Sequence, residues 1–229
     1  MKIHNYQKAI IFDLDGTLID SVSVYLEIFL MLTRKFGKSG EVFNENDFLR
    51  FNGMDIPSVI KKLLSEKRVK ISILPYLFFN KKKLAEEIRA KTKLFPQTRE
   101  CLDKLTSFPM AIATSASADY SAYNLNRFNI SHFFKYCITK EATKNKKPAP
   151  DLFLLVSEKL KILPENCIVI EDSLNGVIAA KRAGMKCIAV LSTTPRDYFT
   201  GESTPDLIIN NLGELTENLI NEFSTTGST

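Results

Sequence analysis

From about residue 96 to its end, the sequence alternates short apolar runs with segments of helical character. The apolar runs have the length of buried strands, and they are Met110–Thr114, Tyr136–Thr139, Cys167–Asp172, Cys187–Leu191 and Asp206–Asn210. The helix-like segments among them are Asp119–Phe128, Asp151–Leu160, Asn175–Ala183 and Leu212–Phe223. Such alternation is typical of a mostly parallel sheet with helices on both faces. We therefore predict an α/β fold with a Rossmann-like, doubly wound parallel sheet, which the apolar run 9–12 also joins.

Residues from about 20 to 94 interrupt this alternation. Helical periodicity is present in the segments 21–36, 56–67 and 80–94, and there is no strong strand signal between them. Pro96 marks the return to the α/β pattern. We predict a helical domain of residues 20–94 inserted into a Rossmann-like core made of residues 1–19 and 95–229. Residues 224–229, a stretch of small polar residues, are expected to form a disordered tail.

The composition excludes several classes of protein. Among 229 residues, 31 are Lys or Arg and 26 are Asp or Glu, and no nucleic-acid-binding motif accompanies the formal charge of +5. The most apolar helical stretch, Val24–Leu32, contains Glu27 and is too short to span a bilayer. The N-terminus has no apolar signal-peptide region, and the cysteines form no C-x-x-C pair. We expect a cytoplasmic protein with reduced thiols that binds neither nucleic acid nor membrane.

Polar side chains capable of holding a metal or a phosphate follow the apolar runs. They are Asp13 and Asp15 after the first run, Thr114 and Ser115 after the second, and Glu171 and Asp172 at the end of a third. In an open α/β sheet, ligands bind beyond the carboxyl ends of the strands, so these side chains are expected at one edge. One such ending alone is as well explained by a helix N-cap. Three coincident endings indicate a binding site.

The paired aspartates suggest the chemistry of that site. Clustered carboxylates repel one another unless a cation lies among them, and their hard oxygens suit Mg²⁺. One of them can then attack phosphorus, because an aspartyl-phosphate is an established covalent intermediate. A transferred phosphoryl group also needs positive charge, which Lys147 can supply from a loop stiffened by Pro148 and Pro150. The same loop is also explained as the start of the helix at Asp151, and the two interpretations are compatible.

Four segments together resemble the motifs of the haloacid dehalogenase (HAD) superfamily, in that family's order. They are "FDLDGT" (Phe12–Thr17), "ATS" (Ala113–Ser115), "KPAPD" (Lys147–Asp151) and "EDSLNGVIAAKRAG" (Glu171–Gly184). The inserted domain is similar to the helical cap of the phosphoglycolate phosphatase and β-phosphoglucomutase branch. The resemblance implies a Mg²⁺-dependent phosphatase, monomeric by default, that hydrolyses a small phosphorylated metabolite through an aspartyl-phosphate.

The resemblance also implies roles for individual residues. Asp13 would be the nucleophile and a Mg²⁺ ligand. Asp15 would act as general acid and then as general base, and would give the metal its backbone carbonyl. Lys147 would neutralise charge and orient Asp13. Asp172 would be the main acidic Mg²⁺ ligand of the last motif, with Glu171 helping directly or through water.

Two further assignments are less specific. Thr114 would bind the phosphoryl oxygens, but Ser115 is a close alternative because "ATSAS" can be aligned with the family in two ways. Thr17 is expected to support its loop by hydrogen bonding. The substrate would be set by the cap face opposite the nucleophile, and its candidate residues are Tyr25, Arg50, Asn52, Gly53 and Met54. The alternative is that Met54 belongs to the core of the cap and that Arg50 is solvated.

Other functions stay open at this stage. Dehalogenases of the family lack a carboxylate at the position of Asp15, so phosphoryl chemistry is favoured. Sugar phosphomutases of the β-phosphoglucomutase type carry a histidine where this chain has Tyr25, and a cap arginine that is missing after Gly53. Both departures favour a phosphatase over a mutase. A non-catalytic protein that binds a phosphorylated ligand is the alternative from a different class.

Overall fold

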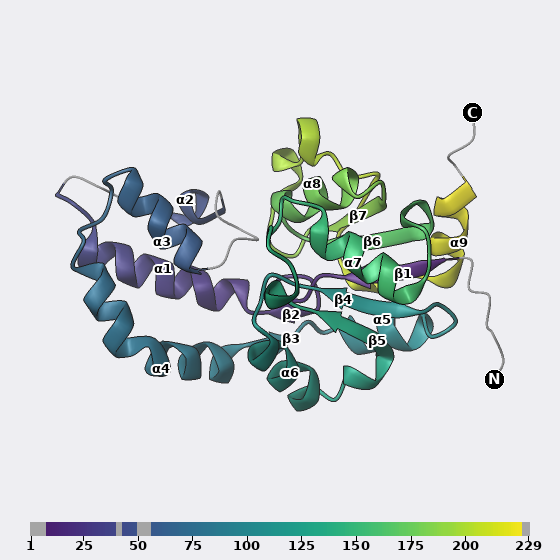
Figure 1. Ribbon diagram of the computed structural model, residues 1–229, viewed down its shortest axis with the longest axis horizontal. Coiled ribbons are helices and arrows are strands. Elements are labelled where there is room, and N and C mark those ends of the chain that lie inside the picture. The colour runs from purple at the N-terminus through teal and green to yellow at the C-terminus, as the bar shows by residue number, and fades with distance from the viewer. Residues whose placement is uncertain (1–7, 40–42, 50–55, 226–229) are drawn as a thin grey trace.

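The computed structural model describes residues 8–39, 43–49 and 56–225 (Figure 1). Four of the residues predicted to line the cap face lie outside these ranges, and they are Arg50, Asn52, Gly53 and Met54. Their predicted contribution to substrate binding stays a prediction. Tyr25 lies within the described residues.

A six-stranded sheet with the order β5-β4-β1-β6-β7-β8 forms the centre of the molecule. Its strands are β1 (Ala9–Phe12), β4 (Met110–Ala113), β5 (Phe134–Ile138), β6 (Cys167–Glu171), β7 (Lys186–Val190) and β8 (Leu207–Ile209). Each pair of neighbouring strands is parallel. The predicted fold class, a Rossmann-like α/β sheet with an inserted helical segment, is confirmed.

Alternate residues of the central strands pack against helices on opposite faces of the sheet, as the strand period of two requires. Phe12 and Ile170 share one core with residues of α5, α6 and α9. Ile11 and Val169 share a second core with residues of α7 and α8. The helices are α5 (Thr98–Lys104), α6 (Ala118–Arg127), α7 (Asp151–Leu160), α8 (Leu174–Arg182) and α9 (Glu217–Thr225). Helices thus cover both faces, as a doubly wound sheet needs.

The C-terminal helix differs from its prediction at both ends. A short 3₁₀ turn occupies Leu212–Glu214, and α9 begins only at Glu217. Leu212 and Leu215 are buried, so their apolar character reflects core packing before the helix starts. The helix continues through Thr225, which corrects the predicted tail boundary at residue 224. Residues 226–229 lie outside the described ranges.

In the described ranges, four helices lie between β2 (Ile19–Asp20) and β3 (Lys93–Leu94) in the sequence and to one side of the sheet in space (Figure 1). They are α1 (Val22–Phe36), α2 (Glu45–Leu49), α3 (Ile56–Ser65) and α4 (Ile73–Lys91), and we call them the helical region. The sequence analysis missed α2, which is too short to show a period, and the first turns of α4. Of the helices in the described ranges, none combines the length and apolar character that crossing a membrane would require.

Two short strands connect the helical region to the sheet. β2 (Ile19–Asp20) leads into α1, β3 (Lys93–Leu94) follows α4, and the two pair antiparallel. The sequence analysis found no strand here because two residues are too few to show an alternating pattern. The predicted boundaries at residues 20 and 94 fall inside this pair.

Candidate active site

The register of the three central strands brings their polar ends to one level. Phe12 of β1 pairs with Ile112 of β4 and with Ile170 of β6. Asp13 directly follows β1, Thr114 directly follows β4, and Glu171 is the last residue of β6. The sheet therefore places side chains from three distant parts of the chain at one edge.

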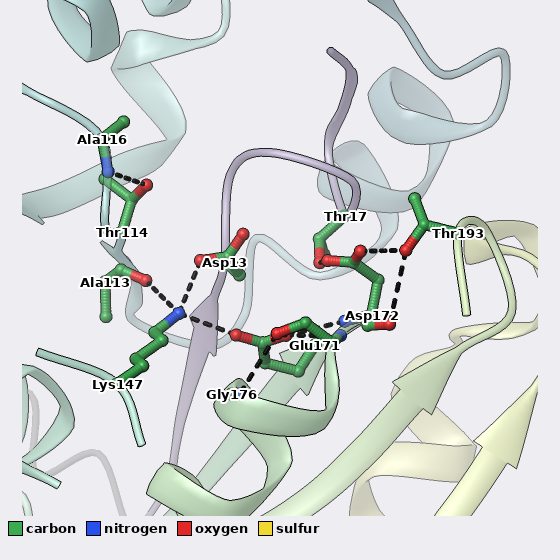
Figure 2. Close-up of polar contacts among 11 residues, drawn as sticks. Asp13, Thr17, Ala113, Thr114, Ala116, Lys147, Glu171, Asp172, Gly176 and Thr193 are labelled. Atoms are coloured by element: carbon green, nitrogen blue, oxygen red, sulfur yellow. Dashed lines mark hydrogen bonds and ion pairs between the residues drawn. The ribbon is translucent and has the colours of Figure 1, made fainter. Parts of the chain in front are cut away.

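Lys147 joins two of the carboxylates at this edge (Figure 2). Its Nζ donates to Asp13 Oδ1 at 2.5 Å and to Glu171 Oε1 at 2.7 Å. A third bond, of 3.0 Å, goes to the backbone carbonyl of Ala113 at the end of β4. All three ammonium protons thus have an acceptor, and the side chain is only 1% exposed. The ammonium is held in one place beside Asp13.

Burial and charge act in opposite directions in this cluster. Burial raises the pKa of the Asp13 carboxyl well above its ordinary value, while the Lys147 ammonium lowers it and Glu171 raises it further. Burial lowers the pKa of Lys147, but the attraction of Asp13 and Glu171 outweighs burial and leaves the pKa above its ordinary value. Lys147 is therefore charged at neutral pH. Further positive charge near Asp13 would lower the pKa of its carboxyl and favour the ionised form.

Asp172 is oriented by hydroxyl groups from two loops (Figure 2). Thr17 Oγ1 donates to its Oδ1 at 2.9 Å, and Thr193 Oγ1 donates to its Oδ2. The loop after β1 can approach this closely because Gly16 has no side chain. Its φ of +89° favours glycine, and a Cβ there would lie 2.2 Å from Asp172 Oδ2.

Glu171 is engaged through both of its carboxylate oxygens. Oε1 accepts from Lys147, and Oε2 accepts from the backbone N–H of Asp172 at 2.9 Å and of Ser173 at 2.8 Å. The Ser173 hydroxyl also donates to Oε2, while it accepts from Gly176 N–H as the N-cap of α8. These contacts connect Lys147 to the start of α8, and they favour a positioning role for Glu171 over direct metal binding.

The two candidate hydroxyls after β4 differ in their partners. Thr114 is buried, and its Oγ1 accepts a hydrogen bond of 3.0 Å from Ala116 N–H (Figure 2). The Ser115 hydroxyl is also buried but has no hydrogen-bond partner among the residues that the structure describes. Since buried polar groups are normally paired, this hydroxyl is available to a ligand. Both residues line the same cavity as Asp13, so the structure brings both alternatives to the site.

Asp15 points to a different set of partners. Its Oδ1 accepts hydrogen bonds from Ser21 Oγ, next to the start of α1, and from Tyr120 Oη of α6 at 3.1 Å. Burial raises the pKa of Asp15, and these two hydrogen bonds partly offset that rise. Burial likewise raises the pKa of Tyr25 well above its ordinary value, with the charge of Asp15 as the next cause. A cluster of hydroxyl groups thus surrounds this carboxyl.

Comparison with known proteins agrees with this geometry. The family model for haloacid dehalogenase-like hydrolases matches residues 10–190 of the chain. The chain belongs to this family. A phosphorylated carbohydrates phosphatase of Thermotoga maritima is 32% identical over 186 residues, which cover 79% of this chain and 83% of that protein. The phosphoglycolate phosphatase of Escherichia coli is 28% identical over 236 residues, with 91% and 90% covered.

The same family resemblance holds in three dimensions. The crystal structure of a putative β-phosphoglucomutase from Thermotoga maritima superposes with a TM-score of 0.67 at 27% identity, and the match covers 96% of this chain and 99% of that one. The predicted membership of the HAD superfamily, in its phosphoglycolate phosphatase and β-phosphoglucomutase branch, is confirmed. The chain is a HAD-like hydrolase, and its relatives named as phosphatases support phosphatase activity.

The donor set of this HAD-like site suits a divalent cation. Within the described ranges, no group of three or more His, Cys, Asp or Glu side chains is arranged so that they could hold a metal ion by themselves. Mg²⁺ needs fewer, because it is usually held by one or two carboxylates together with water and substrate phosphate. The cluster in Figure 2 contains the carboxylates of Asp13, Glu171 and Asp172 and the single ammonium of Lys147. One divalent cation would balance the remaining negative charge.

Sequence patterns did not predict the contacts that Thr193, Tyr120 and Ser21 make with the candidate site. The segment "STT" at 192–194 directly follows the apolar run Cys187–Leu191, so the rule applied to the other strand ends would have found Thr193. Tyr120 has no such signal, because it lies inside α6 and reaches Asp15 only through the fold.

A cavity of about 1080 Å³ begins at the edge of the sheet that carries Asp13 and Lys147. Asp13, Asp15, Ser115 and Lys147 line the end at the sheet edge, which we call the catalytic end after the role predicted for these residues, and the cavity continues between the helices of the helical region. Tyr25 of α1 also lines it, as the sequence analysis predicted for the cap face.

Proposed function

We propose that this HAD-like hydrolase is a Mg²⁺-dependent phosphatase that hydrolyses a phosphomonoester through an aspartyl-phosphate on Asp13. The observation that carries the proposal is the contact of Lys147 Nζ with both Asp13 and Glu171 at the carboxyl edge of the sheet. It supports a nucleophilic carboxylate beside fixed positive charge. Charge stabilisation of this kind is the main requirement of phosphoryl transfer.

In the first step, an Asp13 carboxylate oxygen attacks phosphorus and a new O–P bond forms. The ester bond between phosphorus and the alcohol oxygen breaks at the same time. Asp15, in its acid form, gives its proton to the departing oxygen, so that an alcohol leaves. The raised pKa of Asp15 supports this acid form in the free enzyme.

In the second step, water attacks phosphorus while the Asp15 carboxylate takes one of its protons. The bond between phosphorus and Asp13 breaks, inorganic phosphate leaves, and both aspartates regain their initial state. Thr114 and Ser115 are proposed to bind the phosphoryl oxygens, and the unpaired hydroxyl of Ser115 supports its part in this.

Mg²⁺ would be held by the side chains of Asp13 and Asp172 and by the backbone carbonyl of Asp15. When bound, it supplies positive charge that lowers the repulsion between the carboxylates and the phosphoryl group. Thr17 and Thr193 would keep Asp172 oriented. Glu171 is proposed to act on the metal only indirectly, because both of its oxygens have protein donors.

We further propose that the helical region is a cap domain on a core of residues 1–19 and 95–229. Its connection through β2 and β3 alone, and the cavity between it and the sheet edge, support this assignment. The free state of all four cysteines is consistent with a reducing compartment such as the cytoplasm. A monomer that binds neither nucleic acid nor membrane stays a prediction.

A sugar phosphomutase is the alternative, because a putative β-phosphoglucomutase shares the fold. Tyr25 counts against it. Its raised pKa keeps the phenol neutral, so it cannot accept and return protons near neutral pH as a histidine does.

The test is phosphate release from a panel of phosphomonoesters, measured with Mg²⁺ and with EDTA for the wild type and for Asp13→Asn. We expect release that requires Mg²⁺ and is lost in the variant, while far-UV circular dichroism is unchanged. A variant that keeps the wild-type rate would exclude Asp13 as the nucleophile. Binding of phosphate esters without turnover by the wild type would favour the non-catalytic alternative.

A further inference from the structure

The cavity that starts at the catalytic residues becomes apolar inside the helical region. Its walls there are mainly aliphatic and aromatic side chains from α1, α3 and α4, among them Ile28, Leu32, Ile60, Leu64, Leu77 and Phe78. Within the described part of the helical region, no acidic side chain lines it. The acidic lining residues come from the sheet, the segments after its strands and α6, so the two ends of the cavity differ in chemistry.

The few polar groups at the apolar end are poorly placed to bind sugar hydroxyls. The Thr33 hydroxyl already donates to the backbone carbonyl of Phe29 at 2.9 Å. Lys61 and Lys81 are exposed to solvent, where their ammonium groups are hydrated. Recognition of a hydroxyl-rich substrate needs several buried, directed hydrogen-bonding groups. Tyr25 of α1 and Arg89 of α4 also line the cavity, and Arg89 Nε is buried without a hydrogen-bond partner among the described residues. Apart from these two side chains, the described walls of the helical region offer apolar contact.

The size of the cavity also favours a substrate larger than a small phosphorylated acid. Its volume of about 1080 Å³ lies slightly above the range of roughly 300–1000 Å³ that is typical of pockets for drug-sized ligands. A phosphate group carried on a two-carbon acid would fill only the catalytic end. The remaining volume is continuous with the space beside Asp13, so a group attached to the phosphate can extend into it.

We propose that the substrate is a phosphomonoester whose alcohol carries an extended apolar body, such as a long alkyl or aryl chain, that lies between α1, α3 and α4. This proposal rests on the proposed phosphatase function only in assuming that the phosphate ester is hydrolysed. Binding of the apolar body follows from the lining of the cavity and is measurable without turnover.

The first experiment is titration calorimetry of Asp13→Asn, in Mg²⁺, with n-alkyl phosphates from propyl to decyl. The phosphate end is constant along the series, so differences in affinity report burial of methylene groups. We expect affinity to rise roughly threefold to fourfold for each added methylene until the cavity is filled. Hexyl phosphate should bind more tightly than a hexose phosphate with the same number of carbons.

Adjacent phenylalanines on α4 supply a matched pair of variants. Phe78 lines the cavity, whereas Phe79 is not among the described residues that do. Their exposed fractions are 78% and 81%, and their rings contact each other, so either change to alanine removes that contact at little cost to folding. We expect Phe78→Ala to weaken decyl phosphate binding by about tenfold, with propyl phosphate unaffected, and Phe79→Ala to change neither.

The outcomes separate this proposal from the phosphatase proposal. An affinity that does not change with chain length, preference for the hexose phosphate, or equal effects of the two phenylalanine variants would overturn the apolar substrate. A chain-length dependence that persists while the wild type releases no phosphate from any ester would support the apolar site and overturn the proposed hydrolysis.

Discussion

Tyr120 Oη donates a hydrogen bond of 3.1 Å to Asp15 Oδ1, across 105 positions of the sequence. The same phenol lies 3.4 Å from Thr92 Oγ1, in the segment between α4 and β3. Ser21, which also donates to Asp15, lies between β2 and α1. The proposed general acid is thus connected to both segments that join the helical region to the sheet.

This relationship predicts that Tyr120→Phe slows catalysis without unfolding the protein. The variant keeps the ring and loses one hydrogen bond to the Asp15 carboxyl, a loss of about 0.5–1.5 kcal/mol when that carboxyl is in its neutral acid form. We expect kcat for an alkyl phosphate to fall about tenfold. For an aryl phosphate, whose leaving oxygen needs no proton, the first step should be unaffected.

Tyr123→Phe is the matched control, because Tyr123 lies on the same helix and is 42% exposed. It should leave both rates at the wild-type value. Equal losses for alkyl and aryl phosphates in Tyr120→Phe would show that Tyr120 contributes to structure and not to the position of Asp15.

Lys147→Met is predicted to remove activity and to destabilise the fold. The buried carboxylates of Asp13 and Glu171 lose their shared ammonium, and removing one partner of a buried ion pair typically costs about 3–5 kcal/mol. Urea unfolding monitored by circular dichroism measures this change in the free energy of unfolding.

Lys181→Met gives the comparison at an exposed ion pair with Asp206, where the side chains are 38% and 29% exposed. Its loss should cost less than about 1 kcal/mol. Similar costs for the two lysine variants would contradict a desolvated charge cluster at Lys147.

The raised pKa of Asp13 predicts how stability depends on pH and metal. Its folded-state pKa lies above the unfolded value, so ionisation of Asp13 destabilises the fold once the pH exceeds the unfolded pKa of 3.8. In EDTA at pH 8, Asp13→Asn should therefore be more stable than the wild type. The difference should shrink as the pH falls and Asp13 becomes protonated in the folded state.

With Mg²⁺ bound, we expect the wild type to be more stable than Asp13→Asn. A cation that binds only the folded state raises the Tm, and the wild type should gain much more than Asp13→Asn. Thermal unfolding at pH 8 and pH 5, with Mg²⁺ or EDTA, measures both effects. A Tm of the wild type that does not respond to Mg²⁺ would argue against a metal site at Asp13.

The position of the site at the sheet edge was predictable from sequence. Strand-length apolar runs followed by polar residues predicted the edge at which Asp13, Thr114 and Glu171 now lie, because parallel strands in register end at one level. The helix Asp151–Leu160 was predicted with both of its ends. These are local patterns of hydrophobicity, which the chain carries without reference to its fold.

Other features depend on which residues the fold brings together. The short strands β2 and β3 exist because distant segments pair, and two residues each are too few to leave a pattern in the sequence. The contact of Tyr120 with Asp15, the four donors on Glu171 and the apolar walls of the cavity likewise join residues from separate elements. Local sequence patterns thus predicted the carboxylates of the proposed active site. Their hydrogen-bonding partners and the shape of the cavity depend on tertiary packing, because contacts between residues far apart in the chain leave no local pattern in the sequence.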